Sequence, residues 1–143
     1  MTLEGKHNDL TEMIIGACYK VYNQLGYGFS EKVYENALVI ELSKQGLDVV
    51  QQAAIKVFYE EVLIGEFYAD LLINQSVIVE LKAVHNLLDE HQSQLLSYLK
   101  ASQIEVGLLF NFGPTCQIKR KIFDNARKGS MSWIKNQDQL QTK

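Results

Sequence analysis

The chain has 143 residues, of which 47% are apolar and 22% are charged, and these values suit one compact globular domain. A domain of this length buries enough surface to form a core without disulfides or structural metals. Cys18 and Cys116 are far apart with no C-x-x-C pair, which excludes a zinc knuckle or a disulfide framework. No apolar run is long enough to span a bilayer, and the first ten residues lack the order of a signal peptide. The sequence therefore predicts a cytoplasmic protein without a membrane segment.

Charge is distributed unevenly along the chain. Residues 1–116 carry 7 basic and 15 acidic side chains, for a net charge of −8, whereas residues 117–143 carry 7 and 2, for a net charge of +5. We expect one domain over residues 1–124 and a polar, basic tail over residues 125–143. A basic end can bind an acidic partner such as a phosphate backbone, or it can be a solvated terminus, and the sequence leaves both readings open.

The first third of the chain predicts two helices. Apolar residues recur at three-and-four spacing from Asn8 to Leu25, which indicates an amphipathic helix. The segment Gly26-Tyr27-Gly28 ends it. Ser30 is the expected N-cap of a second helix, which runs to Gly46.

After Gly46 the pattern changes to that of strands. Residues 49–68 are rich in β-favouring side chains and predict a meander. Residues 71–73 and 77–79 are continuously apolar and flank the short segment 74–76, which predicts a hairpin in the interior of a sheet.

The last third predicts one more helix and two more strands. The helix is expected from about Leu88 to Ser102 with Asp89 as its cap, and strands are expected at residues 104–110 and 117–123. A polar tail that contains Trp133 and could be helical follows. This order of elements predicts an α+β or mixed α/β fold.

Three charged residues interrupt the strands that should be buried, namely Asp70, Glu80 and Lys82. Alternation along a strand places Glu80 and Lys82 on the same face. If the hairpin loop consists of residues 74–76, Asp70 lies directly opposite Glu80, with Cβ atoms within roughly 5 Å of each other. A two-residue turn would instead place the two carboxylates on opposite faces.

Two carboxylates this close repel each other unless a cation lies between them or one is protonated. Mg²⁺ suits such a pair because it prefers oxygen ligands and is held by one or two carboxylates together with substrate phosphates. Lys82 could orient or activate a water, or stabilise charge developing on a phosphodiester. The alternative is an ordinary Glu80–Lys82 pair on the wet face of an edge strand.

A polar stripe follows the predicted third helix. His91, Gln94 and Tyr98 lie at positions i, i+3 and i+7, so that Gln94 could bind a phosphate or a base edge and Tyr98 could stack on a sugar or base. His91 could be a metal ligand or a proton shuttle. The alternative is a half-buried helix flank without a substrate. Beside it runs the expected packing stripe, which consists of Leu88, Leu95 and Leu99.

The start of the second helix offers a third carboxylate. Glu31 and Tyr34 lie one turn apart with Glu35 on the same side, and Gly28 precedes the cap. Glu31 could join the metal site, although an acidic first turn also complements the helix dipole.

Taken together, these residues form an ordered set of motifs. Residues 28–34 match G-x-x-E-x-x-Y, Asp70 is followed by Glu80-Leu81-Lys82, residues 94–98 match Q-x-x-x-Y, and residues 111–113 read N-F-G. The chain resembles the GxxExxY proteins, a branch of the PD-(D/E)xK nuclease superfamily related to the RecB-like and Cas4-like nuclease domains. The resemblance covers residues from about Asn8 to Phe123.

The resemblance implies a restriction-endonuclease-like core, in which helices flank a central mixed β-sheet, and a divalent-metal site that cuts phosphodiester bonds. It implies that the metal-binding carboxylates are Glu31, Asp70 and Glu80. It further implies that Lys82 is the catalytic lysine and that Gln94 and Tyr98 support the substrate. Ala69 replaces the proline of the superfamily name, at a position that shapes the strand without touching metal.

We therefore predict a nuclease that depends on Mg²⁺ or Mn²⁺ and hydrolyses nucleic acid, with DNA as the favoured substrate. The predicted catalytic residues are Asp70, Glu80 and Lys82; the predicted metal ligands are Glu31, Asp70 and Glu80; the predicted substrate contacts are Gln94, Tyr98 and His91. Because the core leaves little room for a specificity domain, a homodimer or a protein partner is also conceivable.

Two alternatives belong to other functional classes. The first is a nucleic-acid-binding module or accessory subunit that keeps the fold without cleaving and uses the basic residues Lys119, Arg120, Lys121, Arg127 and Lys128. The second is a protein-interaction domain whose acidic surface avoids nucleic acid. The intact acidic set favours the nuclease, because charges held close together are costly to keep without a purpose.

Overall fold

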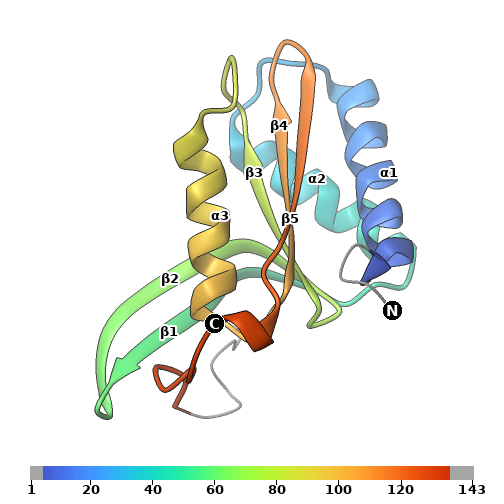
Figure 1. Ribbon diagram of the computed structural model, residues 1–143. Coiled ribbons are helices and arrows are strands. Elements are labelled where there is room, and N and C mark those ends of the chain that lie inside the picture. The colour runs from blue at the N-terminus through green and yellow to red at the C-terminus, as the bar shows by residue number, and fades with distance from the viewer. Residues whose placement is uncertain (1–4, 136–143) are drawn as a thin grey trace.

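The computed structural model of the protein describes residues 5–135 (Figure 1). Its helices are α1 (Asn8–Leu25), α2 (Glu31–Lys44) and α3 (Asp89–Ala101). Its strands are β1 (Val49–Tyr59), β2 (Val62–Ile73), β3 (Val77–Lys82), β4 (Val106–Phe112) and β5 (Cys116–Ile122), and a short 3₁₀ turn, η2 (Asn125–Arg127), follows. The two opening helices, the meander, the hairpin and the third helix are thus all present as predicted.

The five strands form one mixed sheet in the order β1-β2-β3-β4-β5. Neighbouring strands are antiparallel except β3 and β4, which are parallel and are joined through α3. Figure 1 shows α1 and α2 on one face of the sheet and α3 on the other. The predicted mixed α/β fold, with a central mixed sheet flanked by helices, is confirmed.

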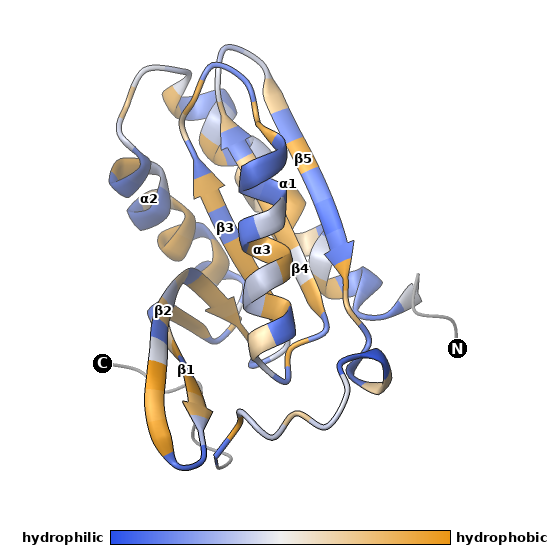
Figure 2. Cartoon of the chain, turned by 60° about the vertical axis from the view of Figure 1, so that its left-hand side comes forward, coloured by the Kyte–Doolittle hydropathy of each residue, from blue (hydrophilic) through white to orange (hydrophobic). Residues whose placement is uncertain are grey.

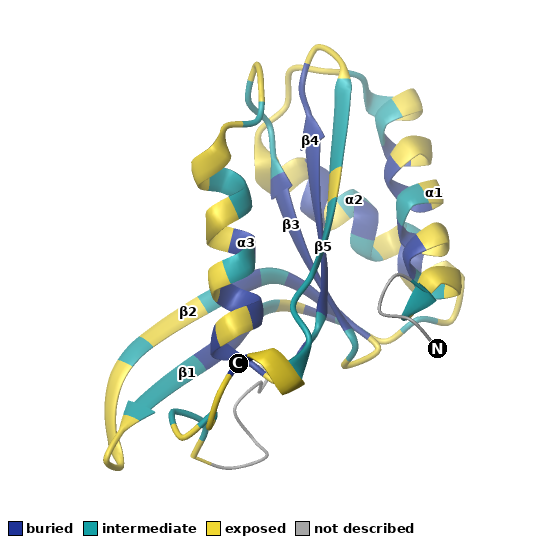
Figure 3. Ribbon diagram, in the orientation of Figure 1, coloured by how far each residue is buried: buried dark blue, intermediate teal, exposed yellow. Residues whose placement is uncertain are grey.

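Helices on both faces divide the interior into two apolar clusters. One lies between α1, α2 and the sheet, and the other between α3 and the sheet. β3 and β4 contribute to both, which explains why they are hydrophobic along most of their length and buried (Figures 2 and 3). A charged residue in β3 is therefore costly, because both faces of this strand are covered.

Gly107 of β4 lies directly against a leucine of α3. A Cβ atom on Gly107 would lie 2.6 Å from Cδ1 of Leu95, so any other residue here would force this leucine side chain to shift. Leu95 and Leu99 are fully buried, as predicted for the packing stripe of α3. Leu95 and Leu99 thus hold α3 against the sheet, and the same helix carries Gln94 and Tyr98.

The start of α3 differs from the prediction. Its N-cap is Leu88 and not Asp89, which is the first residue of the helix. Leu88 is 51% exposed, so its expected place in the packing stripe is wrong. The backbone N–H of Leu88 donates to Nδ1 of His91, 3.0 Å away. The side chain that caps the start of α3 is therefore the imidazole of His91 and not the expected carboxylate of Asp89.

The described part of the basic end contacts the rest of the domain. The indole N–H of Trp133 donates to the carbonyl of Ala101, and the carbonyl of Trp133 accepts from the backbone N–H of Phe58. Residues 136–143 of the predicted tail lie outside the described residues. Between residues 5 and 135, no helix is both long and apolar enough to cross a membrane.

Candidate active site

The register of the β2–β3 hairpin determines where the charged residues lie. Ile73 pairs with Val77 and Leu71 pairs with Val79, so the loop consists of the three residues 74–76. This confirms the condition under which Asp70 faces Glu80. Regular pairing between β2 and β3 stops at Leu71 and Val79, one residue before the two carboxylates.

Beyond this point the backbones of the two strands no longer pair, and backbone N–H groups donate to carboxylates of the opposite strand instead. The backbone N–H of Asp70 donates to Oε2 of Glu80 at 2.7 Å, and the backbone N–H of Leu81 donates to Oδ2 of Asp70 at 2.8 Å. Each carboxylate thus has one oxygen held by the opposite strand. We call this arrangement of Asp70 and Glu80 the carboxylate fork.

Glu80 of the fork is buried, Asp70 is partly buried, and the charges of the two carboxylates repel each other. Glu80 is only 3% exposed, and burial followed by the charge of Asp70 raises its pKa to about 8. Burial is also the main cause of the raised pKa of Asp70, to which the charges of Glu35 and Glu31 add. A bound proton or a cation would therefore relieve the repulsion between the two carboxylates, and their oxygen atoms suit a hard divalent ion.

Lys82 and the flank of α3 complete the surroundings of the fork. Lys82 follows Leu81 on β3, and its Nζ lies 3.4 Å from Oε1 of Gln94 on α3. Tyr98 is 8% exposed, and burial, with the charges of Glu80 and Asp70, raises its pKa to about 12. The structure thus brings together Asp70 and Glu80 with three further predicted site residues, Lys82, Gln94 and Tyr98.

Glu31 and His91 are placed differently. Glu31 is exposed in the first turn of α2, and its charge contributes to the raised pKa of both Asp70 and Glu80. Across residues 5–135, however, no three acidic, histidine or cysteine side chains gather closely enough to hold a metal together. His91 caps its own helix through Nδ1. The metal role of Glu31 and the substrate role of His91 stay predictions.

The tyrosine of the G-x-x-E-x-x-Y motif has a structural role. The hydroxyl of Tyr34 donates to the carbonyl of Gly26 at 2.6 Å and accepts from the backbone N–H of Phe29. Its buried ring stacks on Phe112 with a centroid separation of 4.3 Å. Gly28, which lies between Gly26 and Phe29 in the chain, has a φ of 128°, a conformation that glycine adopts readily. These contacts fix the start of α2, and therefore its acidic first turn, against the sheet.

Glu35 and Gln52 belong to the site and were not assigned a role from the sequence. Glu35 is 4% exposed and accepts hydrogen bonds from Gln51 and Gln52 of β1. Nε2 of Gln52 also lies 3.5 Å from Oδ1 of Asp70. The available signals were the spacing of Glu35 four residues after Glu31, and the polar pair that interrupts the apolar β1.

The N-F-G motif supports the loop that leaves β3 after Lys82. Asn111 is fully buried, and its side chain accepts from the N–H of Val84 and donates to its carbonyl, both at 2.9 Å. A Cβ atom on Gly113 would lie 2.5 Å from that same carbonyl oxygen. Asn111 and Gly113 thus hold the β3–α3 connection in place.

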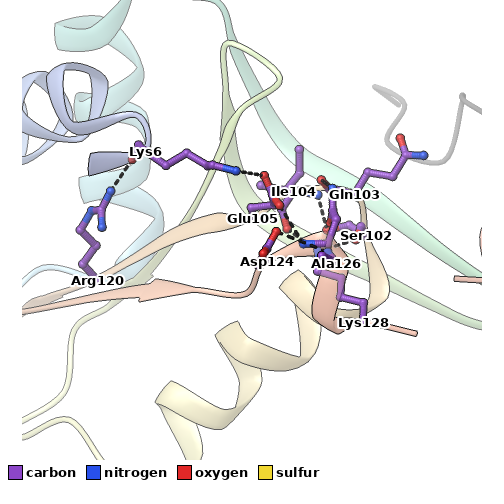
Figure 4. Close-up of polar contacts among 10 residues, drawn as sticks. Lys6, Ser102, Gln103, Ile104, Glu105, Arg120, Asp124, Ala126 and Lys128 are labelled. Atoms are coloured by element: carbon purple, nitrogen blue, oxygen red, sulfur yellow. Dashed lines mark hydrogen bonds and ion pairs between the residues drawn. The ribbon is translucent and has the colours of Figure 1, made fainter. Parts of the chain in front are cut away.

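Two of the basic residues predicted to bind nucleic acid, Lys128 and Arg120, instead bond to other parts of the domain. Lys128 is 1% exposed, and its amine donates to the carbonyls of Ser102 and Ile104. Burial lowers its pKa to about 8. Arg120 donates to the carbonyl of Lys6, whose amine in turn pairs with Glu105 (Figure 4). The expected use of Lys128 for nucleic acid is wrong, because this amine is buried against the segment that connects α3 to β4.

Comparison with known proteins assigns the chain to a superfamily. The family model described as the PD-(D/E)XK nuclease superfamily matches residues 8–122, which include every element from α1 to β5. The chain belongs to the PD-(D/E)XK nuclease superfamily. The matched residues include the carboxylate fork and Lys82.

One solved structure shares the fold of this superfamily member. It is entitled "Crystal structure of SSO0001", and it matches with a TM-score of 0.53 and 16% sequence identity. The alignment covers 87% of this chain and 63% of the other, so the chain spans less than two thirds of that protein's length. No curated protein matches the sequence.

Proposed function

We propose that this protein is a nuclease of the GxxExxY branch that hydrolyses phosphodiester bonds in DNA with the help of Mg²⁺ or Mn²⁺. The observation that carries the proposal is the carboxylate fork. A buried carboxylate, Glu80, and a partly buried one, Asp70, are held face to face at the point where β2 and β3 separate, and each has one oxygen fixed by a backbone N–H of the opposite strand.

Asp70 and Glu80 would hold the ion, with Glu31 as a third acidic group nearby. A structure that only needed stability would not place a buried carboxylate beside a partly buried one, because the charge of Asp70 raises the free energy of the charged form of Glu80. Once bound, a divalent ion would act as a Lewis acid on the phosphate and lower the pKa of a coordinated water.

The remaining residues would bind and orient the substrate. Lys82 lies beside the fork, where its amine can offset charge that develops on the phosphate. The Gln94 side chain, in contact with that amine, would orient it and bind the phosphate backbone. Tyr98 lies close enough to Glu80 for that charge to raise its pKa, and its hydroxyl can donate to the substrate. We propose that a partner or a second copy of the chain supplies substrate selection.

Metal binding tests the proposal apart from cleavage. We expect calorimetric titration with Mn²⁺ to show binding to the wild type and none to Asp70→Asn, because the amide removes a charged ligand but can still accept from the N–H of Leu81. Asp48→Asn, at an exposed position, is the matched control and should bind like the wild type. Equal binding to wild type and Asp70→Asn would place the ion elsewhere and contradict the proposal.

A further inference from the structure

The alternation of side chains in β1 breaks at Gln52. Val50 and Ala53 both pack in the cluster beneath α3, although residues three apart in a regular strand point to opposite faces. In the facing strand, Ala69 and Leu72 show the same break around Asp70. Gln52 has a φ of 53°, in the left-handed region, while its neighbours keep the β1–β2 register.

The break changes what the side chains of β1 can reach. Nε2 of Gln51 lies 2.8 Å from Oε2 of Glu35, and Nε2 of Gln52 lies 3.1 Å from Oε1 of the same residue. Adjacent residues of a regular strand would point away from each other and could not share one carboxylate. The left-handed conformation thus redirects the Gln52 side chain toward α2.

In this position the Gln52 amide lies between two acidic side chains. One contact is to Glu35, and the other, at 3.5 Å, is to Oδ1 of Asp70, whose Oδ2 is held by the N–H of Leu81. We propose that Gln52 is a positioning residue of the metal site, which uses its left-handed backbone to place an amide between Glu35 and Asp70 and so orients the Asp70 carboxylate. The proposal deepens the proposed function and rests on it.

An amide is the group that this position requires. Its NH₂ group has two hydrogens and can donate to both carboxylates without adding charge. A carboxylate here would repel Glu35 and Asp70, while a lysine would compete with the metal for their charge. The amide therefore orients Asp70 and leaves its negative charge for the ion. A non-glycine residue with positive φ is costly, and such strain is found at functional sites.

Three variants separate the amide from the backbone. Gln52→Gly removes the amide and accepts a positive φ, and Gln52→Ala removes the amide while keeping the strain. Gln51→Ala is the matched control, because Gln51 contacts Glu35 but not Asp70. In EDTA, we expect Gln52→Gly to melt above Gln52→Ala. By calorimetry, we expect both to bind Mn²⁺ about 10- to 100-fold more weakly than the wild type, as seen for other residues that orient metal ligands.

The outcomes distinguish the inference about Gln52 from the proposed function on which it rests. If wild type and Gln51→Ala bind Mn²⁺ alike and both Gln52 variants bind it weakly, the inference is supported. If the Gln52 variants bind within twofold of the wild type, or Gln51→Ala loses as much affinity as they do, Gln52 does not orient Asp70 and the inference alone fails. If the wild type does not bind Mn²⁺, the proposed function fails, and the inference with it.

Discussion

Replacement of Lys82 by methionine is expected to slow DNA cleavage by at least about 100-fold, the usual effect of removing one group that stabilises transition-state charge. The variant should keep its melting temperature and bind Mn²⁺ at least as well as the wild type. We expect stability and metal binding to be kept because Lys82 contacts Gln94, whereas Asp70 and Glu80 are held by backbone N–H groups. Single-turnover cleavage rates, measured with saturating Mn²⁺, check this result.

Lys119→Met is the matched control, since it removes the same charge from an exposed position on β5. It should cleave like the wild type at moderate salt. If Lys119→Met lost activity and Lys82→Met kept it, the basic end of the chain and not the fork would dominate the interaction with DNA, and the role assigned to Lys82 would be wrong.

The second large effect is on stability and has the opposite sign to most substitutions in a core. We expect Glu80→Gln to stabilise the metal-free protein at neutral and alkaline pH. The amide oxygen can still accept from the N–H of Asp70, and the neutral amide needs no proton uptake on folding to avoid repulsion by Asp70. The same change should abolish Mn²⁺ binding, so that stability and function move in opposite directions.

The pH dependence follows from the raised pKa of Glu80. The folded protein holds this proton up to about pH 8, whereas the unfolded chain releases it near the ordinary pKa of 4.5. The metal-free wild type should therefore lose stability between these pH values, by at most about 1.4 kcal/mol per pH unit, while Glu80→Gln should not show this loss.

Urea unfolding at pH 5 and pH 8, with EDTA or with Mn²⁺, measures this difference. The advantage of Glu80→Gln should grow from pH 5 to pH 8 in EDTA, and Mn²⁺ should stabilise only the wild type. A Glu80→Gln protein that is less stable than the wild type at pH 8 in EDTA would show that the two carboxylates do not repel each other in the folded state.

Local rules were enough to predict the core of the site. The length of the 74–76 loop and strict alternation in β3 place Asp70 opposite Glu80 and put Lys82 beside it, and neither argument needs information from distant parts of the chain. The stripe of Gln94 and Tyr98 follows equally from helical periodicity.

The features that the sequence did not predict depend on contacts between distant segments or on an exception to a local rule. Gln52 lies in a strand, where a positive φ has no sequence signal unless a glycine or asparagine marks it. The sequence favours a surface position for Lys128, yet its amine is buried and donates to the carbonyls of Ser102 and Ile104, in the connection between α3 and β4. Leu88 caps α3 through His91, which replaces the Asp89 cap expected from residue preferences.

Cleavage itself tests the central claim most directly. Wild type and Asp70→Asn should each be incubated with single- and double-stranded DNA in Mn²⁺, Mg²⁺ or EDTA, at matched protein concentrations. We predict that the wild type cuts at least one of these substrates only when a divalent ion is present, and that Asp70→Asn, although folded, cuts neither. Cleavage that persists in EDTA, or that is equal in the two proteins, would contradict a metal-dependent nuclease built on the carboxylate fork.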